Sequence, residues 1–529
     1  MSKYTAYYAN LTGRLTQLCT VLVLATGVLS GCAVNPVTGE RELTLVSDAQ
    51  AIAIGEQQYA PAQQMQGGEY AVDEALSEYV NEVGQKVAAA SGVPLPYEFV
   101  VLDQSVPNAW ALPGGKIAIN RGLLSEMNSE AELAAVLGHE VAHAAARHGA
   151  QRMERGLITQ GLVLGSMIAV GGGELGVLTM QGAQLAAGLM TQKYSRDAER
   201  EADYYGTRFM AKAGYDPQAA VDLQETFVRL SKGRTAKSAG FLEGLFASHP
   251  PSTERVENNK RLVKELRADG FNQGQLGRDV YAARLSSLRA AQPAFAAFDE
   301  AQKSYADKDL DAALASVNQA LKLDFEQPSF HALRGAIRYQ QSRYADAITN
   351  FDRAVNRDDG YFVYYLQRGL THKKAKNPNS AKSDLDRSVQ LLPTSVAYNA
   401  LGEIAESEGN MDAARQYYAR AGEDKGQAGQ AARANLVRVE LPQQPNKYIR
   451  AAAGRDGSGR YVVQVRNDAS VGVRNVILQV EADLGGRVIT RNVRFAELGP
   501  GQTATSLLGA QFQQAIAVRA YPARAEVAQ

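Results

Sequence analysis

The chain has little cysteine and no excess charge of either sign. Its 529 residues include 2 cysteines, which excludes a disulfide framework even in an oxidising compartment. Lysine plus arginine number 56, and aspartate plus glutamate also number 56, so the formal net charge is zero. Because there is no global basic field, nothing in the composition indicates a nucleic-acid partner.

An uninterrupted apolar run of about 20 residues, the length of a membrane-spanning helix, is also lacking. The N-terminal run from Leu15 to Leu29 is too short for a comfortable span and follows Lys3 and Arg14. It ends in Leu29-Ser30-Gly31-Cys32, which resembles a bacterial lipoprotein signal cleaved before Cys32 and lipidated on its sulfur. An uncleaved N-terminal anchor is the alternative.

This resemblance predicts how the N-terminus is processed and where the protein is held. We expect residues 1–31 to be a signal peptide, lost together with Cys19, and residues 32–48 to be a lipidated linker. Ala33, not aspartate, follows Cys32, which by resemblance to enteric lipoprotein sorting favours the outer membrane, facing the periplasm.

Among the few histidines, two have the spacing of metal ligands. The motif is His139-Glu140-Val141-Ala142-His143, within a predicted helix from Ala131 to His148. A helix turns about 100° per residue, so both imidazoles lie on one face and can bind one Zn²⁺. Glu140 beside them is placed to act as general base. We expect Ser129 with Glu132 to form a capping box and Gly149 to be the C-cap.

A catalytic zinc site needs a third protein ligand, and an acidic helix about 55 residues later offers one. In the run from Tyr194 to Asp203, Glu199 and Asp203 share a face, whereas Glu201 lies about 200° from Glu199. We therefore choose Glu199 as the ligand and expect Asp203 to accept the far N–H of a ligating histidine. A solvated charged helix face is the alternative.

These motifs resemble the zinc metallopeptidase family of the CAAX prenyl proteases and HtpX-type proteases, in its periplasmic, BepA-like branch. The resemblance implies zinc ligation by His139, His143 and Glu199, with Glu140 as general base. It also implies a mainly α-helical, gluzincin-like domain, which we assign to residues 49–270. Further matching segments lie at Asn35–Gly39, Asn108–Gly115 and His249-Pro250 with Arg255.

Other residues near the motifs have open roles. On a continuous helix His148 would lie about 140° from His143, so we predict a surface or helix-end position. His249, on a proline-rich loop, could block the open zinc position, help to stabilise the oxyanion, or only pack the loop. Arg255 and Tyr204 are further candidates for the oxyanion role.

Two segments suggest how substrate is handled. Trp110, Ala111 and Leu112 precede a Pro-Gly-Gly turn and predict an edge strand to which an unfolded peptide can add, or else an ordinary hairpin. Residues 157–191 are apolar and glycine-rich. We favour a buried helical pair over a flap that touches lipid or substrate.

After residue 270 the sequence repeats. Ala313, Ala347, Ala381 and Ala414 are spaced by 34, 34 and 33 residues. This period, with small residues where paired helices cross, is typical of tetratricopeptide repeats, and we assign an α-solenoid to residues 294–438. A plain helical spacer is the alternative.

The C-terminal sequence changes to strands. Tyr461–Val465 and Val476–Val480 are β-rich, and turn signals stand at Gly485-Gly486 and around Pro500. We predict a small antiparallel β-sandwich over residues 445–529, either a binding module or a structural cap.

Together these features predict a zinc endopeptidase that acts on unfolded or misassembled envelope proteins in outer-membrane protein quality control. The repeats would engage substrates or the outer-membrane β-barrel assembly machinery. The main alternative is a chaperone or assembly scaffold with latent proteolysis.

Overall fold

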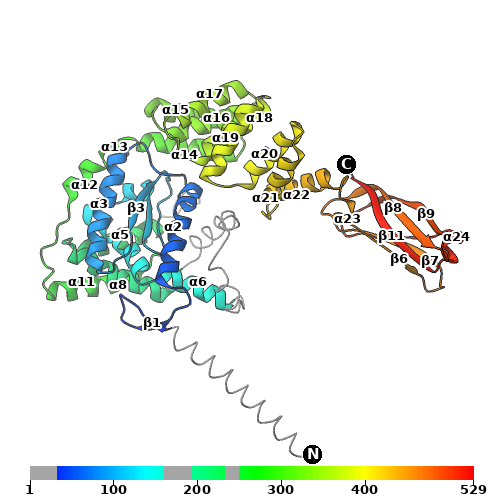
Figure 1. Ribbon diagram of the computed structural model, residues 1–529. Helices are drawn as coiled ribbons and strands as arrows, with labels where there is room; N and C mark the ends of the chain where they lie inside the picture. Colours follow the sequence, from blue (N-terminus) through cyan, green and yellow to red (C-terminus); the bar gives the residue numbers. More distant parts are fainter. Residues whose placement is uncertain (1–31, 160–193, 233–248, 529) are drawn as a thin grey trace, which may run out of the picture. The chain divides into compact units, whose positions relative to one another are not determined.

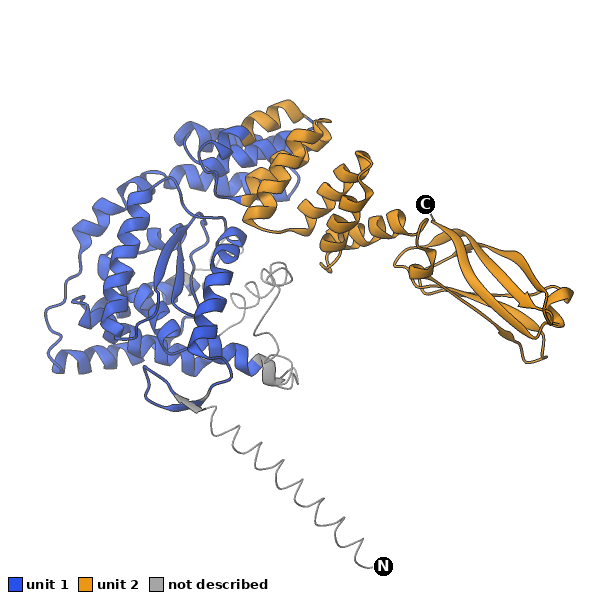
Figure 2. Cartoon of the chain, viewed as in Figure 1, with its two compact units in different colours: residues 1–342, 352–361 blue, residues 343–351, 362–529 orange. Residues whose placement is uncertain are grey.

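The computed structural model describes residues 32–159, 194–232 and 249–528 of the chain (Figure 1). Most of the 157–191 segment, and the predicted signal peptide, lie outside these residues. The chain divides into two compact units (Figure 2). The first holds residues 32–342 and 352–361 of the described chain, and the second holds residues 343–351 and 362–528. In the described part, no helix combines the length and apolar character that a membrane span requires.

The first unit begins with helices around a small sheet. Strand β3 (Glu98–Leu102) pairs in parallel with β5 (Lys116–Asn120), and β4 (Ala109–Leu112) pairs antiparallel with β5. The sheet order β3-β5-β4 therefore leaves β4 at one edge of the described sheet. The hairpin turn at Gly114 and Gly115 requires glycine, since both residues have positive φ.

The helices of this region surround the sheet and carry the motif residues. Their bounds are α2 (Asp48–Met65), α3 (Glu74–Ser91), α4 (Arg121–Glu126), α5 (Glu130–Ala145), α6 (His148–Thr159), α8 (Arg196–Lys212), α9 (Gln218–Lys232), α11 (Thr253–Ala268), α12 (Arg278–Arg284) and α13 (Ser286–Ala290). A short hairpin of β1 (Cys32–Val34) and β2 (Arg41–Leu43) precedes them. The largest hydrophobic cluster packs α3 and α5 against the sheet, with Val80, Leu137 and Ile119 fully buried.

The same cluster continues into the first repeat helices, α14 (Gln292–Ala306) and α15 (Leu310–Leu323). Phe295 packs against Tyr70 at 6.3 Å between ring centroids and lies under the Arg121 guanidinium. Asp299 accepts a hydrogen bond from Ser105 at 2.8 Å. The start of the repeat region is therefore continuous with the core beside the motif helices.

The repeat region is built from helix pairs. After α14 and α15 come α16 (Pro328–Gln340), α17 (Tyr344–Val355), α18 (Phe362–Lys374), α19 (Pro378–Leu391), α20 (Ser395–Ser407), α21 (Met411–Ala421) and α22 (Gln427–Glu440). Each of the four periodic alanines, Ala313, Ala347, Ala381 and Ala414, is fully buried. The predicted tetratricopeptide repeats are confirmed.

The chain ends in two three-stranded antiparallel sheets. After the short helix α23 (Pro445–Tyr448), the strands are β6 (Ile449–Arg455), β7 (Tyr461–Asn467), β8 (Val473–Asp483), β9 (Val488–Leu498), β10 (Thr503–Leu507) and β11 (Ala517–Val527), with α24 (Ala510–Gln513) before the last. The sheet orders are β10-β7-β6 and β11-β8-β9. One cluster draws apolar residues from both sheets, including Val463 and Leu478. The small C-terminal sheets are present as predicted, whereas their arrangement as a sandwich stays a prediction.

Candidate metal centre

Helix α5 carries the histidine motif and is set by caps at both ends. The Ser129 hydroxyl accepts from the Glu132 amide at 3.2 Å, whereas the Glu132 carboxylate accepts from the amide of Asn128, not of Ser129. The helix ends at Ala145, three residues earlier than the alanine-rich sequence predicts. Gly149 is not its C-cap, because Ala146 caps α5 and Gly149 lies inside α6.

A close crossing of α5 and α8 brings the two motifs together. Gly138 and Gly206 face each other at the crossing. A Cβ placed on Gly206 would lie 2.7 Å from the carbonyl carbon of Gly138 and 2.7 Å from the amide nitrogen of His139. Only glycines let the backbones approach this closely. Neither glycine is predicted from the sequence to contribute to the site, although a glycine in each motif helix is an available signal.

At this crossing the side chains of His139, His143, Glu199 and His249 converge. Their nearest ligand atoms all lie within 4.8 Å of one another. His143 Nε2 is 3.0 Å from His139 Nε2 and 3.4 Å from Glu199 Oε1. His249 Nδ1 is 2.9 Å from Glu199 Oε1 and 3.2 Å from His139 Nε2.

Glu140 and Arg255 border this cluster. Glu140 Oε1 is 3.6 Å from His249 Nε2, and its other carboxylate oxygen is buried without a hydrogen-bond partner. Arg255 donates to both oxygens of Asp203 at 2.7 Å and lies 3.0 Å from Glu199 Oε2. Asp203 Oδ1 in turn lies 3.1 Å from His139 Nδ1. Arg255 thus fixes two carboxylates, one of which holds the outer nitrogen of His139.

Burial and charge shift the pKa values of this group. Burial raises the pKa of Glu140, which suits a base that must accept a proton near neutral pH. Burial lowers the pKa of His143 well below its usual value, so this imidazole stays neutral. For Glu199, burial opposes ionisation, but the attraction of His249 and hydrogen bonds from His143 and His249 hold its pKa well below normal.

The donor set fits a divalent metal ion. Two or three imidazoles with one carboxylate are the ligands that zinc takes in catalytic sites. Glu140, Glu199 and Asp203 are buried carboxylates, and the one buried guanidinium beside them, Arg255, pairs with Glu199 and Asp203. With all three ionised and the histidines neutral, two negative charges remain, which a divalent cation would balance.

Several predicted residues lie apart from this cluster or differ from expectation. His148 is buried with 1% of its surface exposed, contrary to a surface position, because α5 ends early and the chain turns back. Its ring contacts the outer side of His143, with 2.8 Å between the two Nδ1 atoms. Tyr204 is 40% exposed, and Arg208 donates to its hydroxyl.

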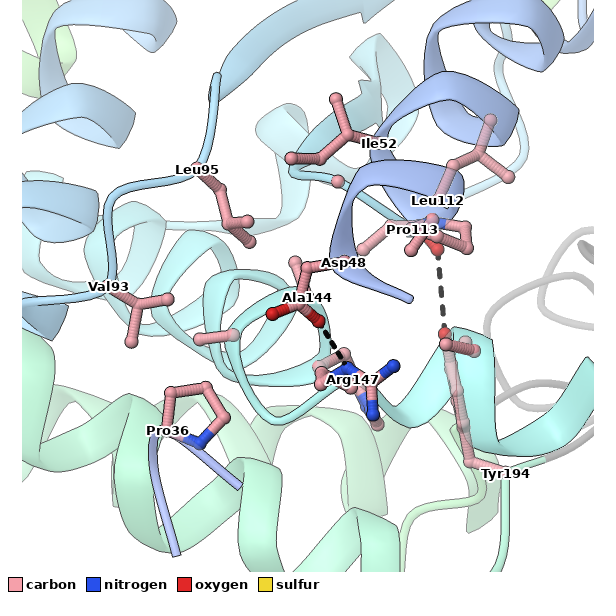
Figure 3. Close-up of a pocket in the computed structure, with 17 residues that line it drawn as sticks. Pro36, Asp48, Ile52, Val93, Leu95, Leu112, Pro113, Ala144, Arg147 and Tyr194 are labelled. Atoms are coloured by element: carbon pink, nitrogen blue, oxygen red, sulfur yellow. Dashed lines mark hydrogen bonds and ion pairs between the residues drawn. The ribbon is translucent and has the colours of Figure 1, made fainter. Parts of the chain in front are cut away.

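The predicted substrate-edge segment forms strand β4, beside the cluster. Trp110, Ala111 and Leu112 are all buried, and the Trp110 indole donates to Gln66 at 3.2 Å. These side chains therefore pack in the core, and a peptide that added to this edge would contact the backbone of β4. The Tyr194 hydroxyl lies 3.5 Å from the Ala111 carbonyl oxygen (Figure 3).

Tyr194 was not predicted to contribute to the site. Its ring stacks on that of His143, with centroids 3.9 Å apart and planes at 16°. The Arg152 guanidinium lies over the Tyr194 ring, 4.5 Å from its centroid, and burial raises the pKa of Tyr194 to about 12. The hydroxyl is therefore a neutral donor, and the ring fixes the orientation of His143.

Known proteins resemble the two regions described above. The profile of Peptidase family M48 matches residues 74–263, and that of the tetratricopeptide repeat matches residues 395–421. A putative beta-barrel assembly-enhancing protease of Vibrio cholerae is 32% identical over 200 residues, which are 36% of this chain and 40% of that protein.

Two further relatives extend this comparison. Metalloprotease YcaL of Escherichia coli is 30% identical over 256 residues, which are 46% of this chain and 95% of YcaL. Mitochondrial metalloendopeptidase OMA1 of Schizosaccharomyces pombe is 34% identical over 188 residues, which are 35% of this chain and 53% of OMA1. The chain thus spans about half or less of the first and third relatives and nearly all of YcaL.

Proposed function

Because the chain belongs to peptidase family M48 and carries its metalloendopeptidase domain, we propose that it is a zinc-dependent endopeptidase of the bacterial cell envelope. Its substrates would be unfolded or misassembled envelope proteins. The observation that carries the proposal is the convergence of His139, His143 and Glu199 beside the buried Glu140.

Each residue of the proposed site has one task. His139, His143 and Glu199 would hold zinc, which when bound supplies a Lewis acid for the peptide carbonyl and the attacking water. Glu140 takes the proton of that water and passes it to the leaving amine. Asp203 orients His139, and Arg255 keeps Asp203 ionised and holds both Asp203 and Glu199 in place.

His249 gives the proposed enzyme a resting state. Its Nδ1 lies 3.2 Å from His139 Nε2 and 2.9 Å from Glu199 Oε1, so the imidazole already contacts two of the proposed zinc ligands. We propose that it occupies the fourth ligand position and that its displacement activates the enzyme. Oxyanion stabilisation by His249 is the competing role.

The envelope assignment rests on the lipoprotein-like N-terminus and on the beta-barrel assembly-enhancing proteases among the relatives. We propose that Cys32 carries the lipid, that the outer membrane is the site, and that the repeats bind substrates or the β-barrel assembly machinery. Mass spectrometry of the mature N-terminus tests the anchor, since Cys32→Ser should leave it unprocessed. An unmodified Cys32 in the wild type would contradict it.

The decisive experiment measures zinc content and casein cleavage by the purified protein. Glu140→Gln removes the proton acceptor alone, so we expect zinc to be retained and cleavage to fall by at least ~10². Cleavage by this variant at the wild-type rate would refute the mechanism.

A chaperone or assembly scaffold is the second candidate, favoured by the repeat helices and by the second unit's separate sheets. In that case Glu140→Gln should suppress aggregation of an unfolded outer-membrane protein as well as the wild type does. We also propose that the two C-terminal sheets form a β-sandwich that caps the repeats or binds a partner.

A further inference from the structure

The two motif histidines are supported differently on their outer sides. The outer nitrogen of His139 meets a carboxylate directly, through Asp203 at 3.1 Å. The outer nitrogen of His143 meets another imidazole, that of His148, at 2.8 Å. His148 then continues to Glu201, with 3.1 Å between its Nε2 and the Glu201 carboxylate.

Because a neutral imidazole carries one N–H, the hydrogen bonds that join His143, His148 and Glu201 can have only one donor-to-acceptor direction. His143 Nε2 faces the other cluster residues, so its single proton belongs on Nδ1 if Nε2 is to bind a metal. Nδ1–H then donates to His148 Nδ1, which must be unprotonated. The proton of His148 is therefore on Nε2, where it donates to the Glu201 carboxylate. Each group has its partner.

The local fold is built to hold His148 in this place. Helix α5 ends at Ala145, and Arg147 adopts φ 61°, a left-handed conformation that non-glycine residues rarely take. The Arg147 guanidinium pairs with Asp48 at 2.7 Å (Figure 3) and also donates to the Val46 carbonyl. Asn35 donates to the Ala146 carbonyl at 2.9 Å.

These contacts tie the turn to the segment before α2. The Glu154 carboxylate on α6 accepts from the amides of Leu45 and Val46, both at 3.0 Å. Residues near the N-terminus of the described chain therefore stabilise the turn between α5 and α6, which places His148 against the outer nitrogen of His143. A helix continued through residue 148 would have sent this imidazole elsewhere.

We propose that His148 and Glu201 are positioning residues that fix the tautomer and orientation of His143 for zinc. This inference rests on the proposed zinc site and adds two residues to it. His148 acts by accepting the His143 proton, and Glu201 acts by holding the proton of His148 on the far nitrogen. Partners of this kind typically contribute 10- to 100-fold to metal affinity.

Zinc affinity, measured on the full-length protein by competition with a chromophoric chelator, tests the proposal apart from activity. His148→Leu fills the space but cannot accept a hydrogen bond, so we expect affinity to fall about 10- to 100-fold. His148→Asn places an amide oxygen near the position of Nδ1 and should lose much less. Glu201→Gln should give a smaller loss than His148→Leu, while the control Glu254→Gln, an exposed partner of Arg200, should give none.

The outcomes separate this inference from the proposed function. A wild-type protein that binds no zinc overturns the proposed function itself. If the wild type binds zinc and His148→Leu binds it equally well, the positioning role alone is wrong. Equal weakening by the Leu and Asn variants would also overturn it, because packing and not hydrogen bonding would then be responsible. Thermal unfolding of each variant establishes that the fold is kept.

Discussion

In both the peptidase domain and the repeats, glycine lets two helices pack closely, but different groups of the partner helix lie against the glycine. In the repeats, a Cβ on Gly369 would meet Leu385 at 2.9 Å, and one on Gly402 would meet Tyr418 at 2.5 Å. An apolar side chain of the paired helix occupies the space. At the peptidase crossing Gly206 meets Gly138, backbone against backbone, and charged side chains gather beside it.

This difference explains why one contact was visible in the sequence and the other was not. Gly369 and Gly402 each meet a residue 16 positions later, so the same pair occurs in two successive repeats. Gly138 and Gly206 are 68 positions apart and occur once. The comparison shows that apolar helix pairs can be built from local repetition, whereas a buried charged cluster needs a crossing unique to the fold.

The largest effect should come from removing the residues that the crossing brings together. We expect His139→Ala, His143→Ala and Glu199→Ala each to weaken zinc binding by more than the ~10²-fold that an outer partner contributes. Glu201→Ala, on another face of α8, should still bind one zinc when zinc is in excess. Metal analysis after gel filtration provides the test. Zinc kept by Glu199→Ala but lost by Glu201→Ala would reverse the ligand assignment.

Replacing His249 should change the rate in a direction that distinguishes its two roles. If His249 occupies the fourth position, His249→Ala should raise basal cleavage of casein or of the protein itself. If it stabilises the oxyanion, the same variant should be slower by ~10²–10³. An initial-rate assay at saturating zinc decides between them. An unchanged rate would discard both roles and leave a packing role for the loop.

The smallest effect, and the sharpest test of the comparison, comes from adding one methyl group. Gly206→Ala forces backbone apart at the crossing, so we expect a stability loss of about 1–3 kcal/mol and weaker zinc binding. A Cβ on Gly402 would lie 2.5 Å from the Tyr418 ring, so Gly402→Ala also has a steric cost, but it should leave zinc binding unchanged. Both variants gain about 1 kcal/mol of helix propensity, which offsets part of each steric cost. Thermal unfolding and zinc titration of both variants are the measurements. Normal zinc affinity in Gly206→Ala would show that the close approach is not needed for the site.

The local sequence predicts most of the helices and strands discussed above correctly, but it predicts less well the residues at which they end. The strand pair around Pro113, the strands that contain Tyr461–Val465 and Val476–Val480, and the repeat period all appear where the pattern predicts them, although the two C-terminal strands lie in different sheets. Helix α5 was predicted to reach His148 because its alanines favour helix. It ends at Ala145 because two residues about 100 positions earlier bind the segment that follows. Asp48 pairs with Arg147, and Asn35 donates a hydrogen bond to the carbonyl of Ala146.

The sequence by itself determined which side chains could share a face: His139 with His143, and Glu199 with Asp203 but not Glu201. Helical spacing sets these relations wherever the helix is continuous. Only the tertiary structure decided which faces meet, through the approach of Gly138 to Gly206, and that His148, Tyr194 and Arg255 surround the histidines. Such contacts join residues far apart in the chain. Their choice depends on packing and on the need to pair every buried charge, which local spacing does not encode.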